Sequence, residues 1–331
     1  MNGFPLLVYP VGNSCPLSCS YCLRRTQKYV PFMSDETLRC LMAQYAEASR
    51  KREVFWSGGE PLLAGIDFYK RAFSLQQPGT QNSIQTSGLL IDSEWCDLFV
   101  EHDVVIGLSY DGLCGGSRGL GQEGVLEAFE MLRARGAAYS AVCVVSSDNL
   151  PIPERIIEDL ALRARFVVFI PRKAHTPEQR PGTEPSGPQF REFLRRVWEH
   201  VQRMKLDVNI RNLDAAASAW KGRPMVCEQE KACGYAAVTE TGDVFPCDHF
   251  VEPDWHLGNI HERSLKDIMD GGVMNVFREA KQIEHPTCEA CPVKAGCNRG
   301  CPKDRWLVNR DYSDLDPMCE ARKYCAEITK P

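Results

Sequence analysis

The stretch Cys15-Pro-Leu-Ser-Cys19-Ser-Tyr-Cys22 places three cysteines within eight residues, directly after an apolar segment near the N-terminus. A second group of eight lies further along the chain: Cys227, Cys233, Cys247, Cys288, Cys291, Cys297, Cys301 and Cys319. Thiolates at short intervals are typical ligands of iron–sulfur clusters, and four of them complete a 4Fe–4S cluster. Eight cysteines therefore fit two complete clusters, whereas three leave one iron with an open coordination position for a substrate.

The composition is that of an ordinary globular protein. The chain has 331 residues, of which 44% are hydrophobic and 25% charged, enough for one large or two medium domains. A net charge of −5 does not favour binding to nucleic acid or to an anionic membrane. No apolar run approaches the roughly 20 residues of a membrane span, and no signal peptide is recognisable. We therefore expect a cytoplasmic protein, in which clustered reduced thiols indicate metal or redox chemistry.

The first two-thirds of the chain alternates strand and helix patterns, which predicts βα units and a parallel sheet. Six short apolar or β-branched runs are the expected strands: Phe4–Tyr9, Glu53–Trp56, Ser83–Thr86, Val104–Ser109, Ser140–Val145 and Phe166–Ile170. Six units are too few for a closed eight-stranded barrel. We therefore expect an α/β fold, an open partial (β/α)6 barrel with its active residues at the C-terminal ends of the strands.

Helix and loop signals complete this division of the chain. Ser34 is a candidate helix N-cap, and Gly136 a candidate helix stop. Residues 171–188 contain five prolines and are expected to form a long loop. From residue 205 onward the pattern is irregular and cysteine-rich. This predicts a barrel domain over residues 1–204 and, over 205–331, a domain ordered by its clusters.

The cysteine triplet resembles the signature of the radical S-adenosylmethionine (SAM) superfamily, Cys-x3-Cys-x-aromatic-Cys, with Tyr21 as the aromatic residue. The resemblance implies that Cys15, Cys19 and Cys22 hold a SAM-binding 4Fe–4S cluster and that Tyr21 stacks against the adenine. Zinc is the alternative metal. It prefers two paired dithiol arms, and the sequence offers no fourth ligand near this triplet.

Ser57-Gly58-Gly59-Glu60-Pro61 ends the second expected strand and resembles the Gly-Gly-Glu-Pro motif of the superfamily. Glycines let the backbone approach a ligand closely and expose its N–H and C=O groups. The resemblance implies that Gly58 and Gly59, together with Glu60, hold the ammonium group of SAM. A glycine-rich turn with a solvated glutamate is the structural alternative.

Two further segments end strands and resemble superfamily motifs near the methionine and ribose of SAM. They are Gln85-Thr86-Ser87-Gly88 and Gly107-Leu108-Ser109-Tyr110-Asp111-Gly112. From this resemblance we expect Ser109 to contact the ribose and Arg118 to contact the carboxylate. Solvent-exposed turn residues are the alternative for both.

The C-terminal cysteines resemble the SPASM domain, an auxiliary-cluster module of peptide- and protein-modifying radical SAM enzymes. The match runs from Gly242-x4-Cys247 through Cys288-x2-Cys291-x5-Cys297-x3-Cys301-x17-Cys319. Family connectivity implies a proximal cluster on Cys227, Cys233, Cys247 and Cys301, and a distal one on Cys288, Cys291, Cys297 and Cys319. The spacing itself does not identify the metal, and two zinc ribbons are the alternative.

Within this module, Thr241–Asp248 and Leu257–Ile260 resemble the anaerobic sulfatase-maturating enzymes. In that family the aspartate after the cluster cysteine is the catalytic base, which implies this role for Asp248; a solvated surface aspartate is the alternative. The chain departs from the family pattern at Leu23-Arg24 and in the short, glycine-rich segment Leu113–Gly121. Both departures fall where a peptide substrate would lie.

The resemblance implies a radical SAM oxidoreductase with three 4Fe–4S clusters and SAM as cofactors. A 5′-deoxyadenosyl radical would take a hydrogen atom from the Cβ of a Cys or Ser in a substrate protein or peptide. Asp248 would remove the thiol or hydroxyl proton, an auxiliary cluster would accept the second electron, and the product would be formylglycine. The implied partners are the substrate, with a sulfatase as the candidate, and an electron donor such as flavodoxin or ferredoxin.

Two alternatives remain open from the sequence. A radical SAM maturase that cross-links or epimerises a ribosomally made peptide would use the same cofactors. A zinc-stabilised binding scaffold would use the same cysteines without any catalysis.

Overall fold

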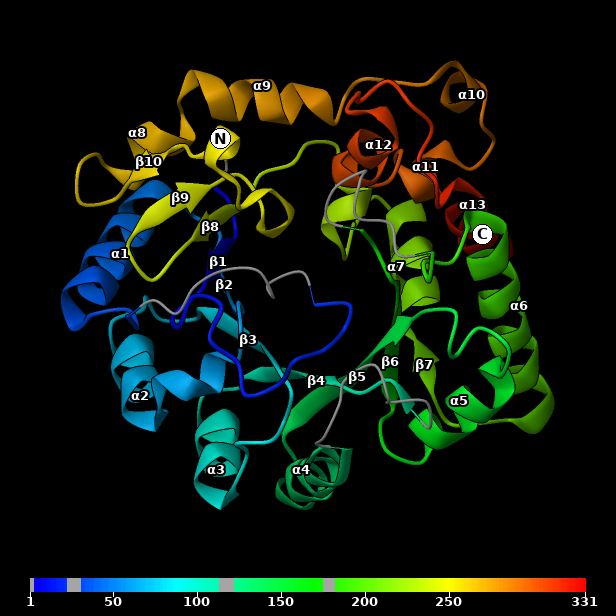
Figure 1. The fold of residues 1–331 in the computed structure, drawn as a ribbon, viewed down its shortest axis with the longest axis horizontal. Helices are drawn as coiled ribbons and strands as arrows, with labels where there is room; N and C mark the ends of the chain where they lie inside the picture. Colours follow the sequence, from blue (N-terminus) through cyan, green and yellow to red (C-terminus); the bar gives the residue numbers. More distant parts are fainter. Residues whose placement is uncertain (1–2, 23–30, 113–121, 175–181) are drawn as a thin grey trace. The chain divides into compact units, whose positions relative to one another are not determined.

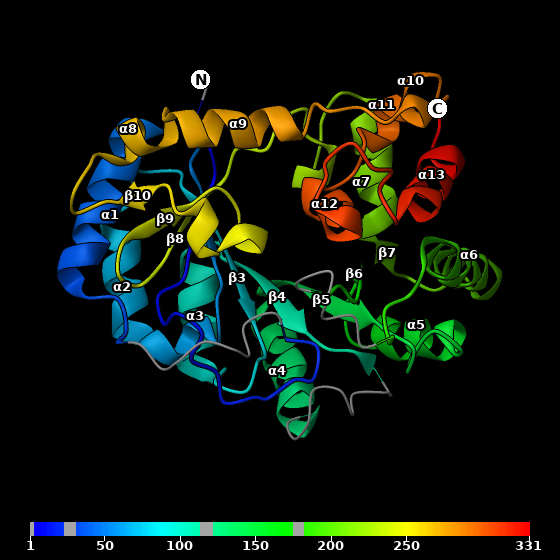
Figure 2. The same cartoon turned by 45° about the horizontal axis from the view of Figure 1, so that its top comes forward.

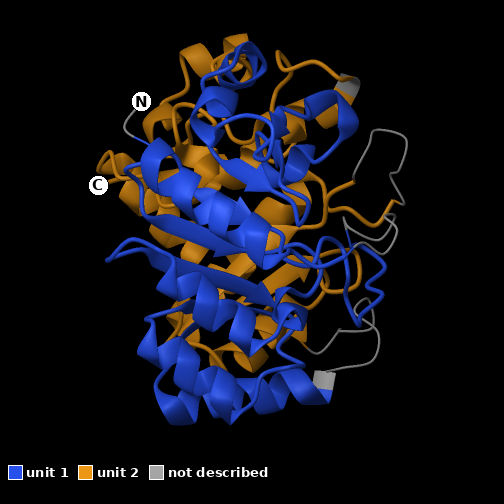
Figure 3. Ribbon diagram, turned by 90° about the vertical axis from the view of Figure 1, so that its left-hand side faces the viewer, with its two compact units in different colours: residues 1–109, 119–139, 234–278 blue, residues 110–118, 140–233, 279–331 orange. Residues whose placement is uncertain are grey.

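A computed structural model describes residues 3–22, 31–112, 122–174 and 182–331 (Figure 1). Arg118, the segment Leu113–Gly121, the pair Leu23-Arg24 and residues 175–181 of the expected proline-rich loop lie outside the described residues. The chain divides into two compact units, coloured separately in Figure 3. Unit 1 comprises residues 1–109, 119–139 and 234–278, and unit 2 comprises residues 110–118, 140–233 and 279–331.

The strands of unit 1 follow one another in the order β10-β9-β8-β1-β2-β3-β4. Their bounds are β1 Leu6–Val8, β2 Glu53–Trp56, β3 Gln81–Thr86, β4 Val105–Ser109, β8 Ala236–Val238, β9 Asp243–Phe245 and β10 Gly258–Asn259. Strands β1 to β4 pair in parallel, as predicted, and β8 pairs in parallel with β1. Strands β9 and β10 extend this sheet by antiparallel pairing.

The helices of unit 1 alternate with its parallel strands in the first part of the chain and follow β9 in the later part (Figure 1). They are α1 Asp35–Ala48, η1 Pro61–Ala64, α2 Ile66–Ser74, α3 Ser93–Glu101, α4 Gln122–Arg135, η4 Asp248–Phe250, η5 Pro253–Trp255, α8 Leu265–Met269 and α9 Gly272–Ala280, of which α9 extends beyond residue 278. The Ser34 side chain accepts from the N–H of Thr37 at 3.1 Å, which confirms the predicted N-cap of α1. Gly136, with φ at +69°, follows the last residue of α4, as predicted.

Trp56 is the centre of the aromatic core between β2 and α2. Its side chain is fully buried and packs edge-on against Tyr69, with ring centroids 5.2 Å apart. Its indole N–H donates to the Asn82 side chain at 2.9 Å, so the polar end of the ring is also satisfied. This packing supports the end of β2, from which the Gly58-Gly59-Glu60 segment emerges.

Unit 2 contains three parallel strands, β5 Ala138–Val145, β6 Phe166–Pro171 and β7 Asn209–Ile210. The first two residues of β5, 138 and 139, are assigned to unit 1. The helices of unit 2 are α5 Pro153–Ala161, α6 Gly187–Met204, α7 Arg211–Trp220, η3 Cys227–Gln229, α10 Pro286–Glu289, α11 Lys294–Cys297, α12 Pro302–Asn309 and α13 Cys319–Ile328. Figure 2 shows α7, α11, α12 and α13 gathered together, and α13 contacts both α6 and α7.

All six expected strands are present, with bounds within two residues of the predicted ones. The predicted α/β fold with a parallel sheet is therefore confirmed. Strands β7 to β10, each of two or three residues, were not predicted, because so short a run shows no hydrophobic alternation. Among the described residues, no helix has the length and apolar character needed to cross a membrane.

Candidate active site

The cysteine triplet lies in the loop that follows β1 in unit 1. The N–H of Cys22 donates to the carbonyl of Cys19 at 3.1 Å, and the N–H of Leu17 donates to the sulfur of Cys15 at 3.4 Å. Burial raises the pKa of the Cys15 thiol to about 11, and negative charge on Glu60, Cys19 and Cys22 acts in the same direction. Three such thiolates need a nearby positive charge to be stable together, which iron supplies when it binds.

The Gly58-Gly59-Glu60 segment holds this loop through its backbone. The N–H of Gly59 donates to the carbonyl of Gly12 at 2.8 Å, and the N–H of Glu60 donates to that of Ser14 at 2.7 Å. A Cβ atom on Gly59 would lie only 2.1 Å from the Ser14 carbonyl oxygen. Glycine is therefore required here for the two loops to approach so closely.

Glu60 is buried, and its carboxylate accepts four hydrogen bonds. The N–H of Leu62 and the hydroxyl of Thr86 donate to Oε1, at 3.3 and 2.6 Å. The N–H and hydroxyl of Ser87 donate to Oε2, at 2.8 and 2.5 Å. A carboxylate has about four lone-pair sites, so these donors use its whole accepting capacity and join the end of β2 to the end of β3.

Ser109 is the last residue of β4, where a parallel sheet presents its site residues. Its hydroxyl accepts from Nε2 of Gln85 at 2.7 Å, and the hydroxyl can still donate to another group. Gly107 leaves room for this pair, since a Cβ there would lie 2.3 Å from Oε1 of Gln85. Tyr21 is half-buried in the cysteine loop.

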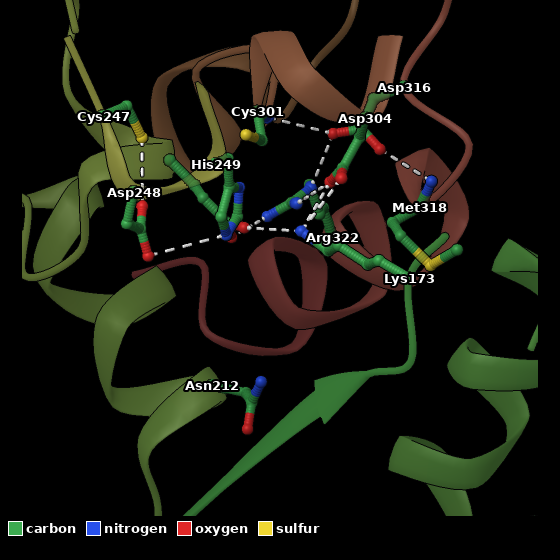
Figure 4. A network of polar contacts seen from close by, with 12 residues as sticks. Lys173, Asn212, Cys247, Asp248, His249, Cys301, Asp304, Asp316, Met318 and Arg322 are labelled. Atoms are coloured by element: carbon green, nitrogen blue, oxygen red, sulfur yellow. Dashed lines mark hydrogen bonds and ion pairs between the residues drawn. The ribbon is translucent and has the colours of Figure 1, made fainter. Parts of the chain in front are cut away.

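Asp248 begins the short helix η4, directly after Cys247 in unit 1 (Figure 4). The Cys247 thiol donates to Oδ1 of Asp248 at 3.1 Å, and Nε2 of His249 lies 3.9 Å from Oδ2. The segment is anchored by Phe250, which is buried and packs edge-on against Phe277 with ring centroids 5.0 Å apart. A metal-bound cysteine is a thiolate and no longer donates, so cluster binding would release Oδ1 of Asp248.

Three of the four predicted proximal ligands share one electrostatic environment in unit 2. Burial raises the pKa of Cys233 to about 12, the ammonium of Lys281 opposes this shift, and Cys301 adds to it. Lys281 is fully buried. Burial lowers its pKa, whereas negative charge on Cys233, Cys301 and Cys227 favours its charged form. The structure therefore gathers these three cysteines around one cation, and places Cys247 in unit 1.

The four predicted distal ligands also influence one another. Cys288 lies in α10, Cys297 ends α11 and Cys319 begins α13. Burial raises the pKa of Cys319 to about 11, and Cys297, Asp316, Cys288 and Cys291 raise it further. Their mutual repulsion as thiolates indicates that the short helices of unit 2 bring these cysteines into one neighbourhood.

An ion network around two buried aspartates in unit 2 was not predicted from the sequence. It consists of Lys173, Glu228, Asp304, Asp316 and Arg322 (Figure 4). Asp316 accepts from Nε of Arg322 at 2.8 Å and from the backbone N–H groups of Cys301, at 3.3 Å, and Met318, at 2.7 Å. The network thus connects the segments that carry Cys301 and Cys319. No sequence signal points to it, because its members are scattered over 150 residues, from 173 to 322.

The donor set of these groups is composed of thiols, which suits iron–sulfur clusters. Within the described ranges, no three His, Cys, Asp or Glu side chains converge on a position for a single metal ion. The three cysteine groups are instead recognised by their spacing and by the electrostatic contacts among their thiols.

Comparison with known proteins supports the interpretation that the cysteine groups bind iron–sulfur clusters. The Radical SAM superfamily matches residues 9–164, and SPASM, an iron-sulfur cluster-binding domain, matches residues 227–292. The fold and the cysteine groups therefore define a radical SAM enzyme with an auxiliary-cluster domain, and the prediction of SAM and 4Fe–4S clusters as cofactors is confirmed.

Relatives that match nearly the whole chain identify the family within the radical SAM enzymes. The chain is 30% identical to the serine-type anaerobic sulfatase-maturating enzyme of Bacteroides thetaiotaomicron, over 95% of this chain and 86% of that enzyme. It is 27% identical to the cysteine-type enzyme of Clostridium perfringens, over 100% of this chain and 97% of the relative. This protein belongs to the family of anaerobic sulfatase-maturating enzymes.

A solved structure shows the same fold. Native anSMEcpe with bound AdoMet and peptide superposes with a TM-score of 0.87 at 24% identity, covering 98% of this chain and 96% of that one.

Proposed function

We propose that this protein oxidises a Cys or Ser side chain of a substrate protein to formylglycine, in the cytoplasm, and that a sulfatase is the substrate. The relatives that support this are named as serine-type and cysteine-type sulfatase-maturating enzymes, and the similarity extends over nearly the whole chain. The observation that carries the proposal is the position of the Asp248 carboxylate, whose Oδ1 lies 3.1 Å from the sulfur of Cys247, a predicted cluster ligand.

The radical site is proposed on the barrel domain, residues 1–204. Cys15, Cys19 and Cys22 would hold the cluster that, with SAM, supplies a 5′-deoxyadenosyl radical. The other residues proposed to bind SAM are Tyr21 at the adenine, Gly58, Gly59 and Glu60 at the ammonium, Ser109 at the ribose and Arg118 at the carboxylate. The four hydrogen bonds to Glu60 favour a role in which it orients the glycine backbone toward the ammonium.

The auxiliary clusters are proposed on residues 205–331. One would be held by Cys227, Cys233, Cys247 and Cys301, the other by Cys288, Cys291, Cys297 and Cys319. The electrostatic contacts within unit 2 support three members of the first set and all four of the second. An external donor such as flavodoxin or ferredoxin would supply the electron that starts each turnover.

Asp248 is the proposed base. Once a hydrogen atom has left the substrate Cβ, the carboxylate would take the thiol or hydroxyl proton, and an auxiliary cluster, when bound, would supply the acceptor for one electron. The carboxylate is 39% exposed, so it can meet a substrate side chain as well as the cluster ligand beside it. Positioned acid–base groups of this kind contribute about 10²- to 10⁴-fold to a rate.

The test is a reaction of the reconstituted protein with SAM, a reductant and two peptides from a sulfatase active-site segment, one with Cys and one with Ser at the target. We expect a product with the mass of formylglycine that also reacts with a hydrazine probe. A peptide with Ala at the target is the control. The hydrazine probe is essential for the Ser peptide, because oxidation to the aldehyde and formation of a cross-link both remove two hydrogens. A modified peptide that does not react with hydrazine would indicate cross-linking or epimerisation instead.

A further inference from the structure

Lys281 is a fully buried cation among predicted cluster ligands. Its ammonium donates to the carbonyl of Glu228 at 2.8 Å and to the carbonyl of Gly300. Glu228 directly follows Cys227, and Gly300 directly precedes Cys301. One side chain therefore joins the two backbone segments that present these cysteines.

Among the residues that the structure describes, no carboxylate pairs with Lys281. Both of its hydrogen-bond acceptors are backbone carbonyls, and in the described part of the chain it forms no ion pair. The neighbouring cations differ in this respect. Arg322 pairs with Glu228, Asp304 and Asp316, and Lys173 pairs with two of the same carboxylates. Three carboxylates thus pair with these two cations, whereas the buried Lys281 pairs with none among the described residues.

A positive charge beside a 4Fe–4S cluster changes the relative stability of its oxidised and reduced forms. A cluster on four thiolates is anionic, and it becomes more anionic when it accepts an electron. A buried cation nearby therefore stabilises the reduced form more than the oxidised form, because buried charges are screened much less than exposed ones. Net charge and surrounding dipoles are among the factors that set cluster potentials.

We infer that Lys281 raises the reduction potential of the auxiliary cluster held by Cys227, Cys233 and Cys301, and so makes that cluster the acceptor of the electron released by the substrate. The inference rests on the proposed function and its ligand assignment. Lys281 acts through its charge and its two carbonyl contacts and is a positioning residue, not a catalytic one. The substrate carbon radical would lose this electron as the thiol or hydroxyl proton moves to Asp248, and the cluster, when bound, would be its acceptor.

The experiment is a redox titration followed by EPR spectroscopy. The full chain carries Cys15→Ala, Cys19→Ala and Cys22→Ala, so that only the two auxiliary clusters, about eight iron per chain, contribute. We expect Lys281→Met to move one of the two midpoint potentials to a more negative value. The expected change is at least tenfold in the oxidised-to-reduced equilibrium, which is 59 mV for a one-electron couple. Lys281→Arg, which keeps the charge, should restore the potential.

Lys231 provides the matched control. It is exposed, it lies two residues before Cys233, and Lys231→Met removes the same formal charge. Solvent and salt screen an exposed charge, so this variant should titrate like the parent. Equal shifts in both methionine variants, or no shift in Lys281→Met at full iron content, would overturn the inference.

Iron content separates the remaining outcomes. If Lys281→Met loses a cluster, the titration uses Lys281→Gln instead, because glutamine can still donate hydrogen bonds. An unshifted midpoint potential in Lys281→Gln would overturn the inference. If both neutral variants lose the cluster, a loaded Lys281→Arg with the parent potential supports it, and an unloaded one overturns it. A parent protein without about eight iron per chain would instead refute the proposed ligand assignment.

Discussion

The carboxylate of Glu60, after β2, accepts two hydrogen bonds from Ser87, after β3: one from the N–H at 2.8 Å and one from the hydroxyl at 2.5 Å. Both residues are buried. The pair connects the ends of two neighbouring parallel strands, which is where a parallel sheet places its ligand site. The segment proposed to hold the SAM ammonium is therefore fixed by the motif that follows the next strand.

Glu60→Gln should weaken both stability and SAM binding. An amide replaces one accepting oxygen by a donor, which then faces an N–H or hydroxyl donor of Leu62, Thr86 or Ser87. A buried donor left unsatisfied costs about 1–3 kcal/mol. We expect a loss of that size in the free energy of unfolding, measured with denaturant on the iron-loaded protein, and weaker SAM binding in equilibrium dialysis.

Ser87→Ala is the matched control for this contact. It removes the hydroxyl donor but keeps the backbone N–H on Oε2 of Glu60. We expect a smaller loss than for Glu60→Gln, because one hydroxyl donor is removed and no two donors are left facing each other. A larger loss for Ser87→Ala than for Glu60→Gln would contradict the central position of the carboxylate.

Asp248→Asn should lower peptide oxidation by about 10²- to 10⁴-fold, because an amide cannot take the substrate proton. Iron content and SAM cleavage in the absence of peptide should stay at the parent level. Asp254→Asn is the control, since this aspartate is exposed in the neighbouring helix η5. Unchanged turnover by the Asp248 variant, measured as aldehyde formed per minute, would remove this residue from the mechanism.

Gly300→Ala should destabilise the protein more than an ordinary glycine replacement. Gly300 has φ at +69°, and a Cβ there would lie 1.7 Å from Oδ2 of Asp316, which accepts from the N–H of Cys301. Gly222 has φ at +68°, and no atom lies within 4 Å of the position that a Cβ atom would occupy there. Gly222→Ala therefore measures the backbone cost alone, roughly 1–2 kcal/mol. We expect a clearly greater fall in thermal stability, and lower iron content, for Gly300→Ala.

Removal of iron should loosen unit 2 selectively. Helices α10 and α11 have four residues each, too few to be stable without tertiary support. Hydrogen exchange after anaerobic chelation should therefore accelerate over residues 286–301. The strands β2 to β4 should remain protected, because their order comes from a packed sheet with Trp56 in its core. Equal protection of residues 286–301 with and without iron would contradict a structural role for the clusters.

The sequence was sufficient for the six parallel strands β1 to β6 and for the identity of the family. All six predicted strands lie in the structure because each is an apolar run long enough to show its pattern. Strands β7 to β10 were missed because they pair over only two or three residues. Asp248 was proposed as the base from the family resemblance of the segment that contains Cys247, whereas its hydrogen bond to that thiol is a structural observation.

The spacing of Cys15, Cys19 and Cys22, and of the eight later cysteines, together with its resemblance to family motifs, was enough to predict iron–sulfur clusters, because the short intervals within these motifs are visible in the sequence itself. The role of Lys281 came only from the fold. In the sequence it is one of 39 basic residues, and its contacts with Glu228 and Gly300 span 53 and 19 positions. Long-range packing determines which charge is buried beside which thiol, and the periodic pattern of the sequence does not show this.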